Sequence, residues 1–374
     1  MLVIVLLMGA LTYFGGTKQA PWTVEVPAGA TVEERGEHEL VVRDGGAERV
    51  YHSESGWRVR ERDDGVRTAF GRRTVNAFFE KGNLVQQTTT ASFIAVMAVG
   101  MTGIIILAGI DISIGSIYAL AAMLAAMAIS KLGGESGSAW QSGLLAVPLV
   151  IAVACTVGGA CGLANGALSV GLRVHPFVIT LGTMAVFRGI VFVISAGQTV
   201  SGMPASIQGG FFKLETGGVY PIPTVIMLII AAAGMFVLSR TVFGRRVYAI
   251  GGNETAAKYA GVPVGRVKVL VYTIAGALAG LSAAMYIGYF GAAESNAGAG
   301  YELKVIAAAV IGGASLSGGR GSAVGAVLGA ILVQLIDNGM IILHIDQSYN
   351  QIVMGSAIIL AVAIDQAKLR LSGR

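Results

Sequence analysis

Long apolar stretches separated by short polar connections fill most of this chain. Ten of them have the composition of membrane helices, and they run over 1–16, 88–109, 113–131, 143–170, 176–196, 221–239, 268–290, 303–316, 322–343 and 350–367. A full crossing needs about 20 apolar residues, so the first and the eighth are short. The eighth is interpreted as a broken or re-entrant element, which is tolerated only where protein or a cavity covers it. The pattern predicts an all-α polytopic membrane protein with about ten transmembrane helices.

A polar module at 17–75 interrupts this pattern after the first apolar stretch. The segments TVEV, ELVVRD, RVYHS and WRVRER alternate or are β-rich, and turn-forming residues separate them at Ala28-Gly29, Asp44-Gly45-Gly46 and Asp64-Gly65. These features predict a small antiparallel sheet of three to five strands. We therefore divide the chain into a first transmembrane helix at 1–16, a β-rich insertion at 17–75 and a transmembrane domain at 76–374. The module either contacts an external partner or is a passive insertion.

Composition and charge agree with a membrane body that carries one polar module. Hydrophobic residues make up 54% of the chain and charged residues 13%, against roughly 25% charged residues in soluble domains. Lys and Arg in the short loops set the orientation. One set of loops holds Arg173, six basic residues of 240–268, Arg320 and the basic C-terminus, and the other holds only Lys131, Lys213 and Lys304. The first set is predicted to be cytoplasmic, with both termini inside and 17–87 outside.

Glycine recurs inside the apolar stretches, with 54 glycines in the chain. Gly158, Gly162 and Gly166 stand four residues apart, and so do Gly276 and Gly280. This spacing places a small face on each of two helices, where small residues let backbones approach closely in lipid. The pattern favours helix packing within the chain, and a dimer seam is the alternative.

The polar segment 240–268 is longer than a simple connection between two spans, since most helix connections have about 2–8 residues. Its sequence NETAAKYAG predicts a short amphipathic helix capped by Asn253 or Thr255, with Glu254 in the first turn and Gly261-Val262-Pro263 at its end. A helix held at the cytoplasmic face is suited to docking of a partner. An interfacial helix without a partner is the alternative.

Sequence motifs of catalysis are missing from this chain. It has no G-x-x-x-x-G-K-[ST] loop, no H-E-x-x-H and no G-x-S-x-G, and its two cysteines and four histidines lack metal-site spacing. We predict no catalytic residues, no metal site and no nucleic-acid partner.

Ionisable residues that are candidates for mid-membrane positions are few: Asp111, Arg188, Asp337 and Asp365. This is too little for a proton relay, and it argues against an ion-coupled carrier. Asp111 either caps a helix together with Ser113 or lines a solute path. Arg188 either anchors a packing site or lines a pore. Two polar loops, Gln198–Ser201 and Glu294–Asn296, are predicted to face outward, and from them we nominate Gln198, Glu294 and Asn296 for the solute path.

Several motifs in register resemble the bacterial sugar permeases of the ribose/xylose/galactose type, which belong to ATP-binding-cassette (ABC) transporters. They are GIDISIGS (109–116), HPFVITLGTMAVFRG (175–189), AIGGNETAAKYAGVPVGRVK (249–268), AGALAGL (275–281), GYELKVIAAAVIGGASLSGGRGSAVGAVLGA (300–330), NGM (338–340) and AIILAVAID (357–365). The resemblance covers about 83–374. It implies a pore subunit of an importer for a monosaccharide or similar small polar solute, in the bacterial inner membrane.

The resemblance also implies the partners. They are cytoplasmic ABC ATPase subunits, an extracytoplasmic solute-binding protein, a second permease copy or a paralogue, and membrane lipid. ATP and Mg would be used by the ATPase, so that no cofactor belongs to this chain. The segment 249–268 matches the family's coupling segment. The resemblance therefore assigns ATPase docking to Gly251, Gly252, Asn253, Glu254, Ala257 and Gly261.

Two features depart from the family. Tyr289 and Glu294-Ser295 stand where the family commonly has an Arg and a Gln-Pro pair, which leaves the solute open, and 17–75 is not typical of the family. An amino acid, nucleoside or polyol importer remains an alternative. So do an ion-coupled carrier and a membrane-anchored scaffold that displays the β-rich module.

Overall fold

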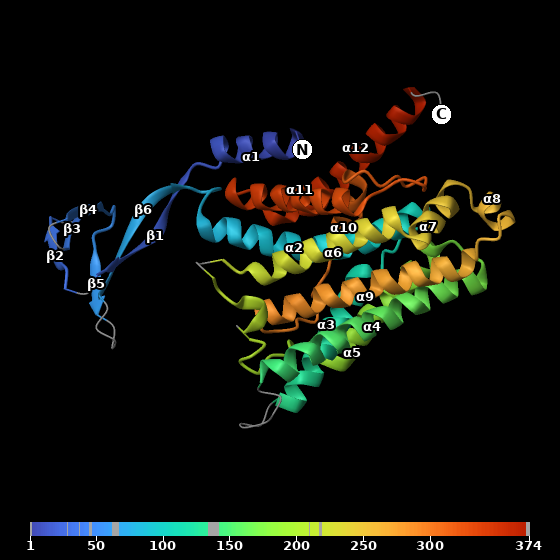
Figure 1. The fold of residues 1–374 in the computed structure, drawn as a ribbon, viewed down its shortest axis with the longest axis horizontal. Helices are drawn as coiled ribbons and strands as arrows, with labels where there is room; N and C mark the ends of the chain where they lie inside the picture. Colours follow the sequence, from blue (N-terminus) through green and yellow to red (C-terminus); the bar gives the residue numbers. More distant parts are fainter. Residues whose placement is uncertain are drawn as a thin grey trace. The chain divides into compact units, whose positions relative to one another are not determined.

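The computed structural model describes residues 2–27, 29–36, 38–44, 47–61, 67–133, 142–208, 210–216 and 219–371, without the side chains of 2, 3 and 364–371. The chain divides into two compact units (Figure 1). One contains Leu2–Leu84 with Ile341–Ile345, and we call it the β unit. The other contains Val85–Met340 with Asp346–Arg374, and we call it the helical unit.

The β unit holds six strands in two antiparallel three-stranded sheets. One sheet has the order β1-β6-β5 and the other the order β2-β3-β4. The strands are β1 (Thr17–Val26), β2 (Thr31–Arg35), β3 (Glu39–Asp44), β4 (Ala47–His52), β5 (Arg58–Glu61) and β6 (Arg67–Asn76). The longest pairing joins β1 and β6, from Thr17 opposite Asn76 to Val26 opposite Arg67.

Aromatic and aliphatic side chains from both sheets form the core of the β unit. The Trp22 ring lies 5.4 Å from Trp57 and 5.6 Å from Tyr51, measured between ring centroids, and Leu40 and Val42 of β3 are buried beside them. The predicted single sheet of three to five strands is therefore wrong in number. β2 and β6 carry mostly charged or small residues, so no apolar alternation marked them, and strand pairing alone reveals them. Ala28, Gly45, Gly46, Asp64 and Gly65 of the predicted turns lie outside the described residues.

The first apolar stretch forms α1 (Leu2–Phe14), a helix of 13 residues. At 1.5 Å per residue it is about 20 Å long, which is shorter than the ~30 Å hydrocarbon core. The side chain of Asn76 donates a hydrogen bond of 2.7 Å to the carbonyl of Thr12 and so ties the end of β6 to α1. Its assignment as the first transmembrane helix remains a prediction.

The helical unit contains the other nine predicted apolar stretches, and each of them is a helix. They are α2 (Lys81–Ile106), α3 (Ile114–Gly133), α4 (Gly143–Leu172), α5 (Pro176–Ser195), α6 (Pro221–Arg240), α9 (Val264–Phe290), α10 (Tyr301–Ile311), α11 (Ala323–Ile342) and α12 (Asn350–Leu371). Among the described residues, seven helices are long and apolar enough to cross a membrane, namely α2 to α6, α9 and α11. The predicted polytopic α-helical fold is confirmed.

Small residues bring α4 and α9 into backbone contact. A Cβ added to Gly158 would overlap the carbonyl oxygen of Gly276, and one added to Gly162 would overlap the carbonyl oxygen of Tyr272. A Cβ on Gly280 would overlap the carbonyl oxygen of Ala154 in the same way. The two predicted glycine faces therefore meet each other inside the chain, which confirms their interpretation as packing surfaces.

The short eighth stretch is a broken element, as the sequence predicts. α10 ends at Ile311, after 11 residues, and a non-helical segment rich in glycines with positive φ continues to α11. Neighbouring elements satisfy this segment's backbone. The amide of Gly319 donates to the carbonyl of Ile106 at 2.9 Å, and the hydroxyl of Tyr248 donates to the carbonyl of Gly321 at 2.7 Å. Irregular backbone at membrane depth is stable only with such cover.

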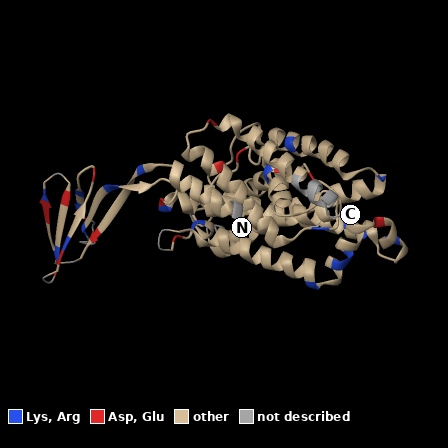
Figure 2. Cartoon of the chain, turned by 90° about the horizontal axis from the view of Figure 1, so that it is seen from above, with Lys and Arg blue, Asp and Glu red and all other residues tan. Residues whose placement is uncertain are grey.

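Charged residues avoid the bodies of the spans. In Figure 2 most of the helical unit is free of blue and red, while colour gathers on the strands and toward the helix ends. Two short helices, α7 (Val242–Gly252) and α8 (Glu254–Tyr259), follow α6 and carry part of this charge. Helix α8 was predicted from the sequence. Helix α7 was not, because its Val-Phe-Gly-Arg-Arg start carries no clear helical signal.

Candidate functional site

Helix α8 is the element that the sequence singled out, and local hydrogen bonds define both of its ends. Asn253 has extended backbone angles, and its side-chain oxygen accepts a hydrogen bond of 2.9 Å from the amide of Ala256. This hydrogen bond identifies Asn253, rather than Thr255, as the N-cap of α8. Gly261 follows the helix at φ +77°, a conformation that favours glycine. The predicted short helix and its boundaries are thereby confirmed.

The six residues assigned to ATPase docking differ in accessibility. Gly252, Asn253, Glu254 and Gly261 are exposed. Ala257 is only 5% exposed, so its side chain packs against the bundle. Ala257 anchors α8 to the bundle, and its predicted part in docking stays a prediction.

Gly251 also has a packing role. A Cβ at this position would overlap the carbonyl oxygen of Ile106 and would lie 2.7 Å from the amide nitrogen of Gly319. Gly251 thus lets the end of α7 touch both the end of α2 and the broken element.

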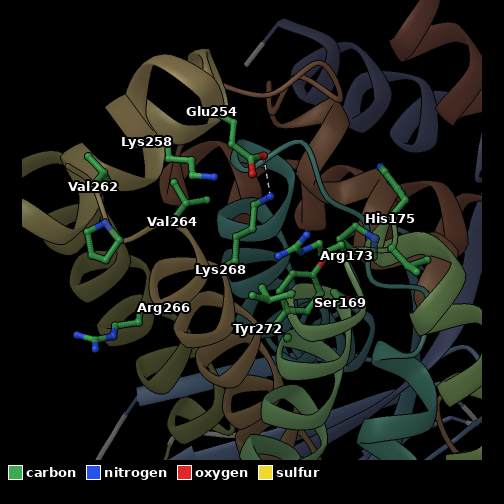
Figure 3. A pocket seen from close by; sticks show the side chains of 16 residues that line it. Ser169, Arg173, His175, Glu254, Lys258, Val262, Val264, Arg266, Lys268 and Tyr272 are labelled. Atoms are coloured by element: carbon green, nitrogen blue, oxygen red, sulfur yellow. Dashed lines mark hydrogen bonds and ion pairs between the residues drawn. The ribbon is translucent and has the colours of Figure 1, made fainter. Parts of the chain in front are cut away.

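A cavity of about 750 Å³ lies between α8, the start of α9 and the connection from α4 to α5. Figure 3 shows the side chains that line it, with the Lys268 ammonium 2.7 Å from the Glu254 carboxylate. The nitrogen atoms of Arg173 and Lys258 turn toward the same space, whereas Arg266 extends away from it. The cavity is therefore walled on one side by α8 and on the other by the α4–α5 connection.

The α4–α5 connection is held tightly where it borders this cavity. Arg173 ends α4 in the left-handed conformation with φ 54°. His175 caps α5 because its Nδ1 accepts a hydrogen bond of 3.3 Å from the amide of Phe177, and Pro176 occupies the first helical position. In the sequence His175 stands only as part of the motif at 175–189, and its capping role is visible in the structure.

Asp111 lies in a closed hydrogen-bond network rather than along an open path. Its carboxylate accepts from the Ser113 amide at 2.8 Å and from the Ser113 hydroxyl at 2.6 Å. The Asn165 side chain donates to Asp111 at 3.2 Å, and Thr183 donates to Asn165 at 2.7 Å. Asp111 is fully buried. The network joins the α2–α3 connection to α4 and α5, and both the capping role and the solute-path role of Asp111 stay predictions.

Arg188 secures the loop that follows α9. Its guanidinium donates to the carbonyl of Ala297 at 2.7 Å and to that of Ser295 at 3.5 Å. Burial of Arg188 is only partial, so the side chain retains an accessible portion. The structure therefore shows the packing-anchor role, and a contribution to a pore remains a prediction.

The two nominated polar loops lie together. Val200 and Ala293 form an isolated antiparallel bridge, and the Ser295 hydroxyl donates to the carbonyl of Gly197 at 3.2 Å. The side chains of the three nominated residues, Gln198, Glu294 and Asn296, are all exposed. The structure thus brings the three nominated residues to one surface formed by two loops that are distant in sequence.

Asp337 pairs with residues that the sequence did not connect to it. Its Oδ2 lies 2.5 Å from Lys304 Nζ, and its Oδ1 accepts a hydrogen bond of 2.8 Å from Asn350. The pair joins α10, α11 and the start of α12. The sequence carries only a weak signal for this pair, namely that Lys304 and Asp337 belong to two successive apolar stretches. The side chain of Asp365 lies outside the described residues.

A polar stretch at the start of α2, QQTTTAS over 86–92, also escaped the sequence analysis. The Tyr289 hydroxyl donates to the Gln86 side chain at 3.4 Å, and Gln86 donates to Thr90 at 3.3 Å. The run of five consecutive polar residues at 86–90, beside an apolar stretch, is the sequence signal that could have indicated this cluster. Across the described residues, no group of three or more His, Cys, Asp or Glu side chains could hold a metal ion.

Comparisons with known proteins agree on the family. The model of a family described as the permease component of the branched-chain amino acid transport system matches residues 83–362. The D-allose transport system permease protein of Escherichia coli K12 is 37% identical over 297 residues, which cover 79% of this chain and 87% of that protein. The match to the family model begins at residue 83, after the last strand of the β unit, so the strands lie outside that match.

Two further relatives give the same result. The ribose import permease protein of Bacillus subtilis 168 is 37% identical over 295 residues, covering 78% of this chain and 87% of that protein. The galactose/methyl galactoside import permease protein of Escherichia coli K12 is 34% identical over 298 residues, covering 76% and 87%. No solved structure matches this chain. The chain belongs to this family of transport-system permease components, and it is a membrane permease subunit rather than an enzyme.

Proposed function

We propose that this chain is the permease subunit of an ABC importer for a monosaccharide. The observation that carries this proposal is the match, at 34–37% identity over more than three quarters of the chain, to permeases named for allose, ribose and galactose. The family's description names branched-chain amino acids. The named relatives nevertheless support the sugar branch.

In this proposal α8 is the coupling helix that receives movement from a cytoplasmic ATPase. Glu254 of α8 and the flanking residues Gly252, Asn253 and Gly261 are exposed and available for contact with the ATPase. The ATPase supplies the binding and hydrolysis of ATP with Mg, and this chain converts the resulting movement into opening and closing of a pore. Rigid-body rotation of packed elements is a known form of such switching.

The structure offers a route for this movement. Ala257 is the buried residue of α8, and Gly251 touches the end of α2 and the broken element. A displacement of α8 therefore moves α7, the Ile106 end of α2 and the connection between α10 and α11 together. Because closely packed interiors deform little, the displacement is transmitted rather than absorbed.

We further propose that α8 lies at the cytoplasmic face of the bacterial inner membrane, with both termini inside and 17–75 outside. The support is the excess of Lys and Arg in 240–268 over the loops on the opposite side. The surface formed by Gln198, Glu294 and Asn296 then faces outward. It would receive sugar from a solute-binding protein, and a second permease copy or paralogue would complete the pore.

Transport by the reconstituted complex tests this proposal. The permease is co-expressed with candidate ABC ATPases, purified and placed in proteoliposomes with a binding protein and radiolabelled D-ribose, D-allose or D-galactose. We expect ATP-dependent uptake of one of these sugars. Glu254→Lys should reduce both ATPase co-purification and uptake. The matched control is Glu215→Lys, the same exchange at an exposed position outside the coupling segment, and it should change neither.

Three outcomes would contradict the proposal or one of its parts. Uptake that follows an ion gradient and persists without any ATPase would identify a secondary carrier. ATP-dependent uptake of an amino acid with none of the three sugars would retain the importer but remove the sugar assignment. Equal effects of Glu254→Lys and Glu215→Lys would remove α8 from the docking site.

A further inference from the structure

The cavity beside α8 holds more positive than negative charge. Arg173 from the end of α4, Lys258 from α8 and Lys268 from α9 turn their nitrogen atoms into it, and Glu254 is the single carboxylate among its lining residues (Figure 3). Glu254 is already paired with Lys268 at 2.7 Å. Within the described part of the chain, Arg173 and Lys258 have no ion pair. Two cations are therefore left to attract an anion.

The backbone adds to this attraction. Helix α5 has 20 residues, and its N-terminus at His175 and Pro176 borders the cavity. The N-terminus of a helix carries a partial positive charge, which favours negatively charged ligands. Only this charge acts here, because Pro176 has no amide hydrogen and the amide of Phe177 already donates to His175. The helix dipole thus acts in the same direction as Arg173 and Lys258, from a third element of the chain.

We propose that this cavity binds a phosphate group and thereby braces α8 against the α4–α5 connection. The planar guanidinium of Arg173 matches phosphate oxygens in a two-bond arrangement, while Lys258 supplies a point charge from the opposite wall. A volume of about 750 Å³ is within the range of small-molecule sites. The phosphate belongs either to a soluble phosphomonoester or to the head group of an anionic lipid.

A phosphate explains the cavity better than an acidic protein segment does. Three of the four exposed docking residues, Gly252, Asn253 and Gly261, are not among the cavity-lining residues. The fourth, Glu254, lines the cavity and is already paired with Lys268. A ligand bound between α8 and the bundle would connect Lys258 on the moving helix with Arg173 on the fixed connection, and would leave the other three docking residues accessible to a partner protein.

Binding to the isolated full-length permease tests the inference. The protein is placed in phosphatidylcholine nanodiscs, and its thermal unfolding midpoint is followed with inorganic phosphate, D-ribose 5-phosphate, and D-ribose as the uncharged control. Parallel discs contain phosphatidylglycerol. We expect either the soluble phosphates or the anionic lipid to raise the midpoint by a few degrees, because a ligand that binds the folded state stabilises it. D-ribose should have no comparable effect at this site.

Single exchanges assign the response to the cavity. Arg173→Gln and Lys258→Gln should each weaken the apparent affinity by about tenfold, the effect of losing one charge-assisted hydrogen bond. The matched control is Arg246→Gln, an exposed cation on α7 that does not line the cavity, and it should leave the affinity unchanged. Monodisperse elution verifies before each titration that all three variants are folded.

The outcomes separate the sources and the alternatives. A cavity-dependent response to soluble phosphate identifies a phosphomonoester site, and a cavity-dependent response to phosphatidylglycerol alone identifies a lipid site. Absence of any response, or equal responses in Arg173→Gln, Lys258→Gln and Arg246→Gln, overturns the inference. So does loss of ATPase co-purification in the first two variants without a phosphate response, since the cavity would then receive an acidic protein segment. The measurement needs neither sugar nor ATPase, so its failure leaves the transport test intact.

Discussion

The guanidinium of Arg188 on α5 donates a hydrogen bond of 2.7 Å to the carbonyl of Ala297, 109 residues later in the chain. This contact fixes the loop between α9 and α10, which presents Glu294 and Asn296. A charged side chain within a span is costly unless it finds such partners. Arg188 therefore positions the loop that carries two residues of the proposed solute surface.

Removing this contact should loosen the loop. We expect Arg188→Gln to lower the free energy of unfolding by about 1–3 kcal/mol, the cost of losing a hydrogen bond to a charged group. Amide hydrogen exchange over 291–300 should rise, while exchange in α8 stays unchanged. Arg188→Lys should retain part of the protection because the charge remains. Unchanged exchange in 291–300 for Arg188→Gln would show that the loop is held by other contacts.

Two neighbouring glycines on α4 offer a sharp comparison. Gly158→Ala places a methyl group against the carbonyl oxygen of Gly276, whereas at Gly159 the nearest atom to an added Cβ is 3.7 Å away. We expect Gly158→Ala to separate α4 from α9 and to lower the unfolding midpoint markedly. Gly159→Ala should be neutral or slightly stabilising, since alanine favours helix by up to about 1 kcal/mol over glycine. Thermal unfolding in detergent measures both, and equal midpoints would contradict the close packing of the two helices.

The pair formed by Lys304 and Asp337 should show strong coupling. Asp337 is 6% exposed, and its Oδ2 lies 2.5 Å from Lys304 Nζ. Removing one partner of a buried pair leaves an uncompensated charge and typically costs about 3–5 kcal/mol. We expect Lys304→Met and Asp337→Asn each to destabilise the protein, and the double variant to cost less than the sum. A double-mutant cycle measures this coupling, and strictly additive effects would show that the pair contributes little.

The β unit should lose stability in acid through Glu80. Partial burial would raise the pKa of this carboxyl group, but hydrogen bonds from the amides of Gly82 and Asn83 and the ammonium of Lys18, 3.3 Å away, together lower the pKa below its ordinary value. A carboxyl group whose pKa is lowered by folding stabilises the folded protein at pH values above its ordinary pKa. This stabilisation is lost as the pH falls through the folded-state pKa.

Tryptophan fluorescence, to which Trp22 and Trp57 of the β unit contribute, should report this loss. We expect the unfolding midpoint of the native protein to fall as the pH is lowered through the acidic range. Glu80→Gln should start from a lower midpoint at neutral pH and should show a smaller further decrease. Parallel pH profiles of the two proteins would exclude Glu80 as the source.

Sequence alone determined the apolar spans, the broken eighth element and the short helix after Asn253, because each depends on residues that are adjacent in the chain; the structure selected Asn253 over Thr255 as its cap. The length of an apolar run decides whether lipid can surround it, and a capping side chain acts on amides two or three residues away. The motifs of 83–374 also led to the permease family, which the relatives confirm.

Tertiary structure decided what depends on distant residues. It buried Ala257, closed the network around Asp111, joined Lys304 to Asp337 and divided the β unit into two sheets. It also brought Arg173 and Lys258 to one cavity, although 84 positions separate them in the sequence. Local patterns cannot specify such pairs, because the face that a helix turns toward its neighbour depends on how all the helices pack together.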